Sequence, residues 1–181
     1  MTLRPPDPPL ADDAIRLVPM GPRHVPGIEA LLEDADARRH TRVPSEPPQG
    51  FATTWLGRYE DGWRDGTRAG FAIEAHDGEF LGLGMVVEID WDAREGEIGY
   101  VLSPDARGRG AATRTLRLLT EWGFEQLELE RIELLIDVGN PASERVAERA
   151  GYVQDGVLRS VWFKEDIRID LGIWSRLRSD R

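Results

Sequence analysis

The sequence predicts one domain of the mixed α/β (α+β) class, in which a single mixed sheet of about seven strands carries helices on its faces. Its length of 181 residues is typical of one domain. Segments with apolar residues at a period of two, or at helical spacing, follow the order strand, helix, helix, three strands, helix, strand, helix, two strands. A hydrophobic fraction of 40%, with six Trp residues, is enough to fill one core.

The first part of the chain predicts an arm, a strand and two helices. Residues 1–13 are expected to form a flexible or extended arm, because four prolines exclude a helix there, and the domain is placed at residues 14–181. Ile15–Pro19 is predicted to be the first strand. Arg23–Glu33 carries apolar residues at helical spacing, and a second helix is expected from Phe51 to about Gly62.

The middle of the chain predicts a hairpin, a further strand and a long helix. From Gly70 the apolar period becomes two, and the turn His76–Glu79 leads into a strand that runs from Phe80 to Trp91. Glu97–Leu102 is predicted to be the next strand. A helix follows from about Gly110 to Leu127, since its apolar residues form one stripe.

The remainder of the chain returns to strands after one short helix. Ile132–Val138 alternates as a strand, and Pro141–Ala150 is predicted to be helical. Gly151 then opens a last β region that extends through Trp174. These elements complete the predicted sheet.

The segment Arg107–Thr113 predicts a phosphate-binding loop. Small residues let the backbone approach a ligand, the helix that opens there points free amides outward, and two arginines add positive charge. A flexible Gly-Arg-Gly turn with solvated arginines is the alternative. The loop lacks the Gly-Lys-Ser/Thr of a P-loop, and Thr113 stands where a dinucleotide loop has its third glycine.

Charge and composition exclude several classes of partner and site. A formal net charge of -10 repels phosphate backbones, so nucleic acid is not an expected partner. The chain has no Cys, and its three histidines are expected to be surface imidazoles, so no metal site is predicted. The acidic, proline-rich start and the short apolar runs predict neither a signal peptide nor a membrane partner, and hence a cytoplasmic protein.

Further motifs accompany the loop. Arg107, Gly110 and Ala112 fit the pattern Arg or Gln, two residues, Gly, one residue, Gly or Ala. Other motifs lie upstream and downstream, at Gly96–Leu102, Asn140–Ser143 and Ala150–Tyr152. Through these motifs the chain resembles, from about Ile15 to Trp174, the GNAT N-acetyltransferase superfamily, and within it the ribosomal-protein-alanine N-acetyltransferase branch.

The resemblance implies a single GNAT-type domain with a mostly antiparallel sheet, helices on both faces, and acetyl-CoA as co-substrate without a metal. The backbone of Tyr100–Leu102 would pair with the pantetheine arm, and the amides of Gly108–Thr113 would hold the pyrophosphate. Acetyl transfer would be a direct attack by the amine in a ternary complex, so no covalent enzyme nucleophile is needed. The implied cofactor-binding residues are Tyr100, Val101, Leu102, Arg107, Gly108, Arg109, Gly110, Ala111, Ala112, Thr113, Asn140 and Ser143.

Glu97 is the predicted catalytic base, acting directly or through water, because its strand leads into the cofactor loop. A structural or solvated strand carboxylate is the alternative for Glu97. Glu88 and Asp90 lie one strand earlier and share a pleat face, where they would attract a cationic substrate or form a solvated edge.

The resemblance implies that Ser143 is the catalytic acid that assists the leaving thiolate. Many relatives have a Tyr for this purpose seven residues after the Asn, and Ala147 occupies that position here. An alternative is purely local: Asn140 followed by Pro141 is an ordinary helix start, and Ser143 would then only complete the first turn.

The predicted function is transfer of an acetyl group to an amine, either a protein N-terminus or a small molecule such as a polyamine or aminoglycoside. A non-catalytic acyl-CoA-binding module of the same fold is the alternative, motivated by Ala147. The sequence does not decide between a monomer and a homodimer. One or two members of an aromatic set are expected to line the acceptor groove while the rest pack in the core: Trp55, Tyr59, Trp63, Trp91, Trp162 and Trp174.

Overall fold

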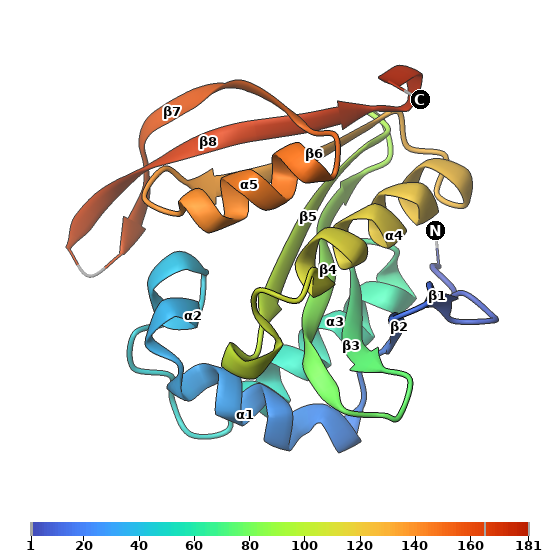
Figure 1. Ribbon diagram of the computed structural model, residues 1–181, viewed down its shortest axis with the longest axis vertical. Helices are drawn as coiled ribbons and strands as arrows, with labels where there is room; N and C mark the ends of the chain where they lie inside the picture. Colours follow the sequence, from blue (N-terminus) through green and yellow to red (C-terminus); the bar gives the residue numbers. More distant parts are fainter. Residues whose placement is uncertain (1, 165, 181) are drawn as a thin grey trace.

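An eight-stranded sheet with helices on both faces forms the protein in the computed structural model, which describes residues 2–164 and 166–180 (Figure 1). Its strand order is β1-β2-β3-β4-β5-β6-β8-β7. Every described neighbour pair is antiparallel except β5 and β6, which run parallel. The expected mixed, mostly antiparallel sheet is therefore confirmed, with one strand more than predicted.

The elements have these bounds: β1 Leu10–Ala11, β2 Ile15–Pro19, α1 Val25–Glu33, α2 Ala35–His40, α3 Phe51–Asp65, β3 Ala69–Ala75, β4 Phe80–Asp90, β5 Glu95–Leu102, α4 Ala111–Glu125, β6 Arg131–Asp137, α5 Pro141–Arg149, β7 Val153–Lys164 and β8 Ile167–Leu177. The sequence did not predict α2, because its six residues are mostly polar and only Ala37 is buried. None of the described helices is long and apolar enough to cross a bilayer.

The N-terminal segment, which was expected to be a flexible or extended arm, packs on the domain. Its backbone is extended, and Leu10 and Ala11 pair with β2 as the additional strand. Leu3 is only 7% exposed, and its amide donates to the Trp63 carbonyl at 2.9 Å. The prolines exclude a helix, but the apolar side chains of the segment still have core surface to cover.

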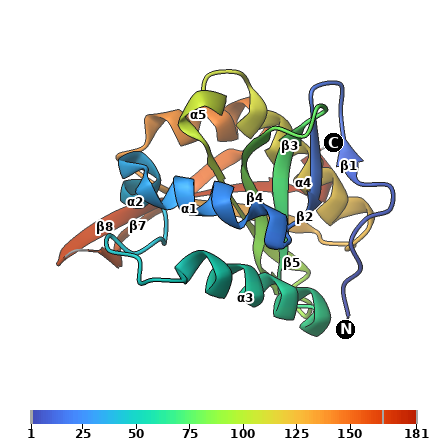
Figure 2. The same cartoon turned by 90° about the horizontal axis from the view of Figure 1, so that it is seen from below.

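Two apolar layers cover the two faces of the sheet. Helices α4 and α5 pack on one face, and α1, α2 and α3 on the other (Figure 2). Because successive strand residues point to opposite faces, β4 and β5 supply both layers. On β5, Ile98 belongs to the α4 layer and Val101 to the α3 layer.

The sheet opens between β5 and β6. Their parallel pairing covers only Glu95–Glu97 of β5 and Arg131–Glu133 of β6. Beyond this point β5 stays paired with β4 as far as Leu102, and β6 stays paired with β8 as far as Asp137. A register shift in β4 between Val86 and Glu88 lies beside the same region. The two central strands therefore present unpaired edges toward each other.

Candidate active site

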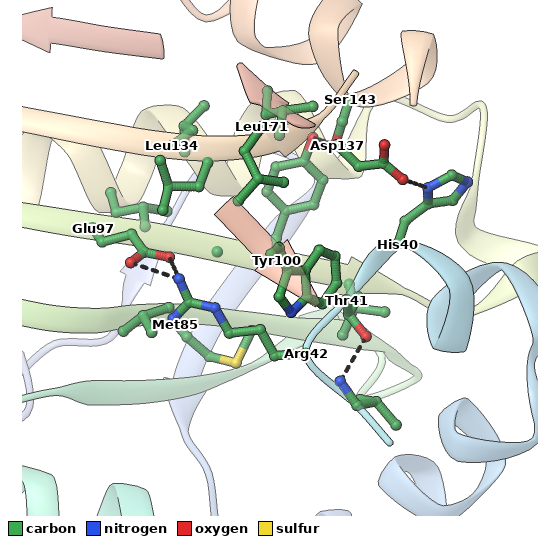
Figure 3. Close-up of a pocket in the computed structure, with 18 of the residues that line it drawn as sticks. His40, Thr41, Arg42, Met85, Glu97, Tyr100, Leu134, Asp137, Ser143 and Leu171 are labelled. Carbon is green, nitrogen blue, oxygen red and sulfur yellow. Dashed lines mark hydrogen bonds and ion pairs between the residues drawn. The ribbon is translucent and has the colours of Figure 1, made fainter. Parts of the chain in front are cut away.

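A cavity of about 280 Å³ lies where β5 and β6 diverge (Figure 3). Side chains from both strands line it, together with residues of β4, α3, the segment between α2 and α3, the start of α5, and the terminal hairpin β7–β8. Trp55, Tyr59 and Trp162 are among these residues, so three members of the aromatic set line the cavity rather than the one or two predicted. Helices of both faces therefore reach the pocket between the strand edges, α3 from one face and the start of α5 from the other.

Glu97 points into one end of this cavity and contacts Arg42. The two Glu97 carboxylate oxygens lie 3.0 and 3.1 Å from the Arg42 guanidinium (Figure 3). Burial raises the pKa of Glu97, Arg42 opposes that shift, and Glu88 across the β4–β5 pair adds to it. Glu97, the predicted base, is therefore a largely buried carboxylate beside a cation. It lies on β5, the strand that was expected to lead into the cofactor loop.

Tyr100 and Ser143 meet at the other side of the cavity. The Tyr100 hydroxyl on β5 lies 2.7 Å from the Ser143 hydroxyl on α5 (Figure 3). Burial raises the pKa of Tyr100 to about 12, against the opposing hydrogen bond with Ser143. The phenol is thus protonated at neutral pH. The sequence suggested only the backbone of Tyr100 as functional, and gave no sign that its side chain reaches α5.

Asn140 caps α5, as the local interpretation of this motif predicted. Its side-chain oxygen accepts a hydrogen bond from the Ser143 amide at 3.1 Å. The Ser143 side chain is not used in that cap, because its hydroxyl meets Tyr100. Ala147, one turn further along α5, has 0% of its surface exposed and packs in the α4 layer. Ala147 is therefore a core position of this helix.

The loop before α4 leaves the start of that helix free. Gly108 and Gly110 have φ values of 74° and 83°, a region that favours glycine. Gly110 precedes a 15-residue helix, and no side chain caps its first amides. Apart from Gly110 and its two chain neighbours, no atom of the described residues lies within 4 Å of the point where a Cβ at Gly110 would stand. Open space in front of uncapped amides suits an anion such as a diphosphate.

The sequence suggested that Arg107 and Arg109 both offer positive charge to a phosphate, but the structure gives them different surroundings. Arg107 contacts Asp34 at 2.7 Å and Asp36 at 3.2 Å, and it donates to the Leu102 carbonyl at 3.1 Å. Its positive charge thus ties the loop to the start of α2. Arg109 is exposed beside the helix mouth, and it is the arginine whose charge stays available to a ligand there.

The histidines depart from the expected surface positions. His24 is 5% exposed and lies 3.0 Å from the buried Glu74, while His40 lines the cavity with its Nδ1 2.8 Å from Asp137. Only His76 is fully on the surface. No motif links His40 to Asp137, because they are 97 positions apart. Within the described ranges no group of three or more potential metal-ligating residues occurs, so the structure offers no candidate metal site there.

Comparison with known proteins gives a consistent result. The acetyltransferase (GNAT) domain family matches residues 14–153. The putative ribosomal N-acetyltransferase YdaF of Bacillus subtilis is 31% identical over 146 residues, which is 81% of this chain and 72% of that protein. The spermidine N(1)-acetyltransferase of Escherichia coli is 31% identical over 105 residues, 58% of this chain and 56% of that protein.

Solved structures share the fold. The spermidine N-acetyltransferase of Vibrio cholerae, in complex with CoA and spermine, superposes with a TM-score of 0.81 at 22% identity over 93% of this chain and 98% of that one. The ribosomal L7/L12 α-N-protein acetyltransferase RimL, in complex with coenzyme A, gives a TM-score of 0.85 at 19% identity over 96% and 98% of the two chains.

Proposed function

The chain belongs to the GNAT acetyltransferase family, and we propose that it transfers the acetyl group of acetyl-CoA directly to the amine of a protein N-terminus or a small molecule. The observation that carries this proposal is the cavity between the unpaired edges of β5 and β6, which places a buried carboxylate and a hydroxyl pair around one space. Acetyl-CoA supplies the activated thioester carbonyl.

The chain's own groups suit such a co-substrate. The uncapped amides of Ala111, Ala112 and Thr113 would hold the pyrophosphate, with the exposed Arg109 beside them. Tyr100–Leu102 would offer backbone groups to the amides of the pantetheine arm, since the only described strand paired with this part of β5 is β4, and the Leu102 carbonyl also accepts a hydrogen bond from Arg107. Asn140 and Ser143 would line the path at the start of α5.

Glu97 would accept the proton that the amine loses, directly or through one water. At pH 7 deprotonation costs about 1 kcal/mol for an α-amine of pKa near 7.8 and about 4.6 kcal/mol for a lysine amine near 10.4. A carboxylate whose pKa is raised by burial is a better proton acceptor than a solvated one, and Arg42 favours its ionised form. The amine nitrogen can then bond to the carbonyl carbon as the carbon–sulfur bond breaks.

Ser143 and Tyr100 would stabilise the departing thiolate as hydrogen-bond donors. A thiol has a pKa of about 8.5, so complete proton transfer from a phenol of pKa about 12 would cost roughly 5 kcal/mol. Donation without full transfer avoids that cost and still stabilises the developing negative charge. The side chain of Tyr100 thereby supplies a phenol to this region although Ala147 replaces the usual tyrosine.

Two measurements on the purified protein test the proposal. Calorimetry should detect acetyl-CoA binding, and a thiol reagent should detect CoA release with a panel of amines and N-terminal peptides. Binding without CoA release from any amine would favour the non-catalytic acyl-CoA-binding module. Absence of acetyl-CoA binding would refute both functions.

A further inference from the structure

Three arginines are among the residues that line the cavity. Arg42 comes from the segment between α2 and α3, Arg58 from α3, and Arg68 from the residue before β3. They reach the cavity from separate parts of the chain, so no sequence motif unites them. Their charge contrasts with the formal net charge of -10 on the whole protein.

The carboxylates of the described residues leave this positive charge only partly neutralised. Glu97 forms its ion pair with Arg42. Neither Arg58 nor Arg68 forms an ion pair with a carboxylate in the ranges 2–164 and 166–180. The cavity lining thus holds three guanidinium groups and two carboxylates, of which Glu97 pairs with Arg42.

The buried phenol of Tyr59 lies within the electrostatic reach of two of these arginines. Burial raises the pKa of Tyr59, while the charges of Arg68 and Arg42 lower it and that of Glu97 raises it. Groups that act together on one buried phenol lie around it. Arg58 is the residue before Tyr59 on α3 and lines the same cavity.

The other acidic groups near the site do not balance these arginines. Asp137 lies on the far side of Tyr100, where it contacts His40 and accepts from the Gly139 amide (Figure 3). Glu88 and Asp90, which the sequence suggested for attraction of a cationic substrate, are both exposed. Asp90 is engaged by the amides of its own turn. The electrostatics thus disfavour an acceptor with several positive charges.

We propose that the acceptor carries a carboxylate near its reactive amine, as an amino acid or a peptide with an acidic residue close to its N-terminus does. This inference rests on the proposed acetyltransferase function and specifies its substrate class. A guanidinium binds a carboxylate through two parallel hydrogen bonds, so Arg58 and Arg68 can hold the anionic group while Glu97 receives the proton of the amine. A polyamine would bring further cations toward the same arginines.

Matched acceptors that differ by one carboxylate test the proposal. The peptide amides Ala-Glu-NH2 and Ala-Gln-NH2 share their N-terminal amine and differ by one carboxylate, L-alanine and L-alaninamide form the corresponding free amino-acid pair, and spermidine serves as the polycation. CoA release should show a kcat/KM at least about tenfold higher for the acidic member of the preferred pair. The preferred pair identifies whether a peptide or a free amino acid is the source of the carboxylate.

Arginine variants test whether Arg58 and Arg68 cause the preference for the acidic acceptor. Arg58→Gln and Arg68→Gln should raise KM for the acidic acceptor and reduce its advantage over the amide to less than about threefold, with acetyl-CoA affinity unchanged. Arg64→Gln is the matched control, because Arg64 lies on the same helix but is 69% exposed and pairs with Asp61 outside the cavity. Rising salt should weaken the preference of the unaltered protein.

Measurements of acceptor binding test the inference even if the protein does not transfer an acetyl group. Calorimetry of each acceptor with the CoA complex should show tighter binding of the acidic member even if no acetyl group is transferred. Equal affinity and kcat/KM within both pairs, or a preference for spermidine, would overturn the substrate class while leaving acetyl transfer intact. Failure of acetyl-CoA binding would instead refute the proposed function on which the inference rests.

Discussion

The hydroxyl of Tyr100 lies 2.7 Å from the hydroxyl of Ser143, although the two residues are 43 positions apart in the chain. This contact joins β5 to the first turn of α5 across the cavity. If the pair stabilises the leaving thiolate as one unit, Tyr100→Phe and Ser143→Ala should each lower kcat by about 10- to 100-fold with little change in KM for acetyl-CoA. Steady-state kinetics of both variants would measure this loss.

The double variant separates a shared function from two independent ones. Tyr100→Phe combined with Ser143→Ala should lose little more activity than the worse single variant, because residues that act as a unit are non-additive. Multiplicative losses in the double variant would show that the two hydroxyls act separately.

Glu97→Gln should lower kcat/KM by about 100-fold or more, since the amide cannot accept the proton of the amine. A base works only when it is deprotonated, so the activity of the unaltered enzyme should fall as pH drops through the raised pKa of Glu97. Arg42 lowers that pKa, and Arg42→Gln should therefore move the acid limb of the pH profile toward higher pH. A limb that stays in place in Arg42→Gln would contradict the assignment of Glu97.

Gly110→Asp should weaken acetyl-CoA binding by about 30-fold or more, because a carboxylate would stand in front of the amides proposed for the pyrophosphate. Gly110→Asn is the control, since Asn has nearly the same shape, tolerates the φ of 83°, and carries no charge. Calorimetric titration would compare the two. Equal affinity in both variants would mean that the loop does not bind the diphosphate.

Arg107→Ala should lower the free energy of unfolding by about 1–2 kcal/mol, because it removes a part-buried ion pair and leaves Asp34 without it. Although burial raises the pKa of Asp34, the hydrogen bonds from Arg107 and Ala37 lower it overall. A carboxylate with a depressed pKa stabilises the fold above its usual range and loses that contribution as pH falls. Chemical denaturation at pH 7 and pH 3 should therefore show the effect of Arg107→Ala mainly at pH 7.

Arg109→Ala provides the contrast to Arg107→Ala. Arg109 is exposed, so its removal should leave unfolding unchanged and reduce acetyl-CoA affinity in a salt-dependent way. Loss of stability in Arg109→Ala, or unchanged stability in Arg107→Ala, would reverse the roles assigned to the two arginines.

Features that depend on neighbouring residues could be predicted from the sequence. The periodicity that predicted β2, the β3–β4 hairpin, α4 and α5 reports which side chains face a core, and it requires no knowledge of what covers them. The Asn140 cap and the glycine loop before α4 are also local, because their hydrogen bonds and dihedral angles span only a few residues. A short polar helix such as α2 carries little of this signal.

Only the tertiary structure decided which distant side chains meet, in the cavity and beside it. Arg42 reaches Glu97, His40 reaches Asp137, and Arg107 turns toward Asp34 across separations of 55, 97 and 73 positions. Such contacts follow from strand register, from the early end of the β5–β6 pairing and from the packing of α2 beside the site, none of which the local pattern encodes. The sequence by itself thus determined most of the elements and the glycine loop before α4, whereas the fold determined which charged groups line the cavity.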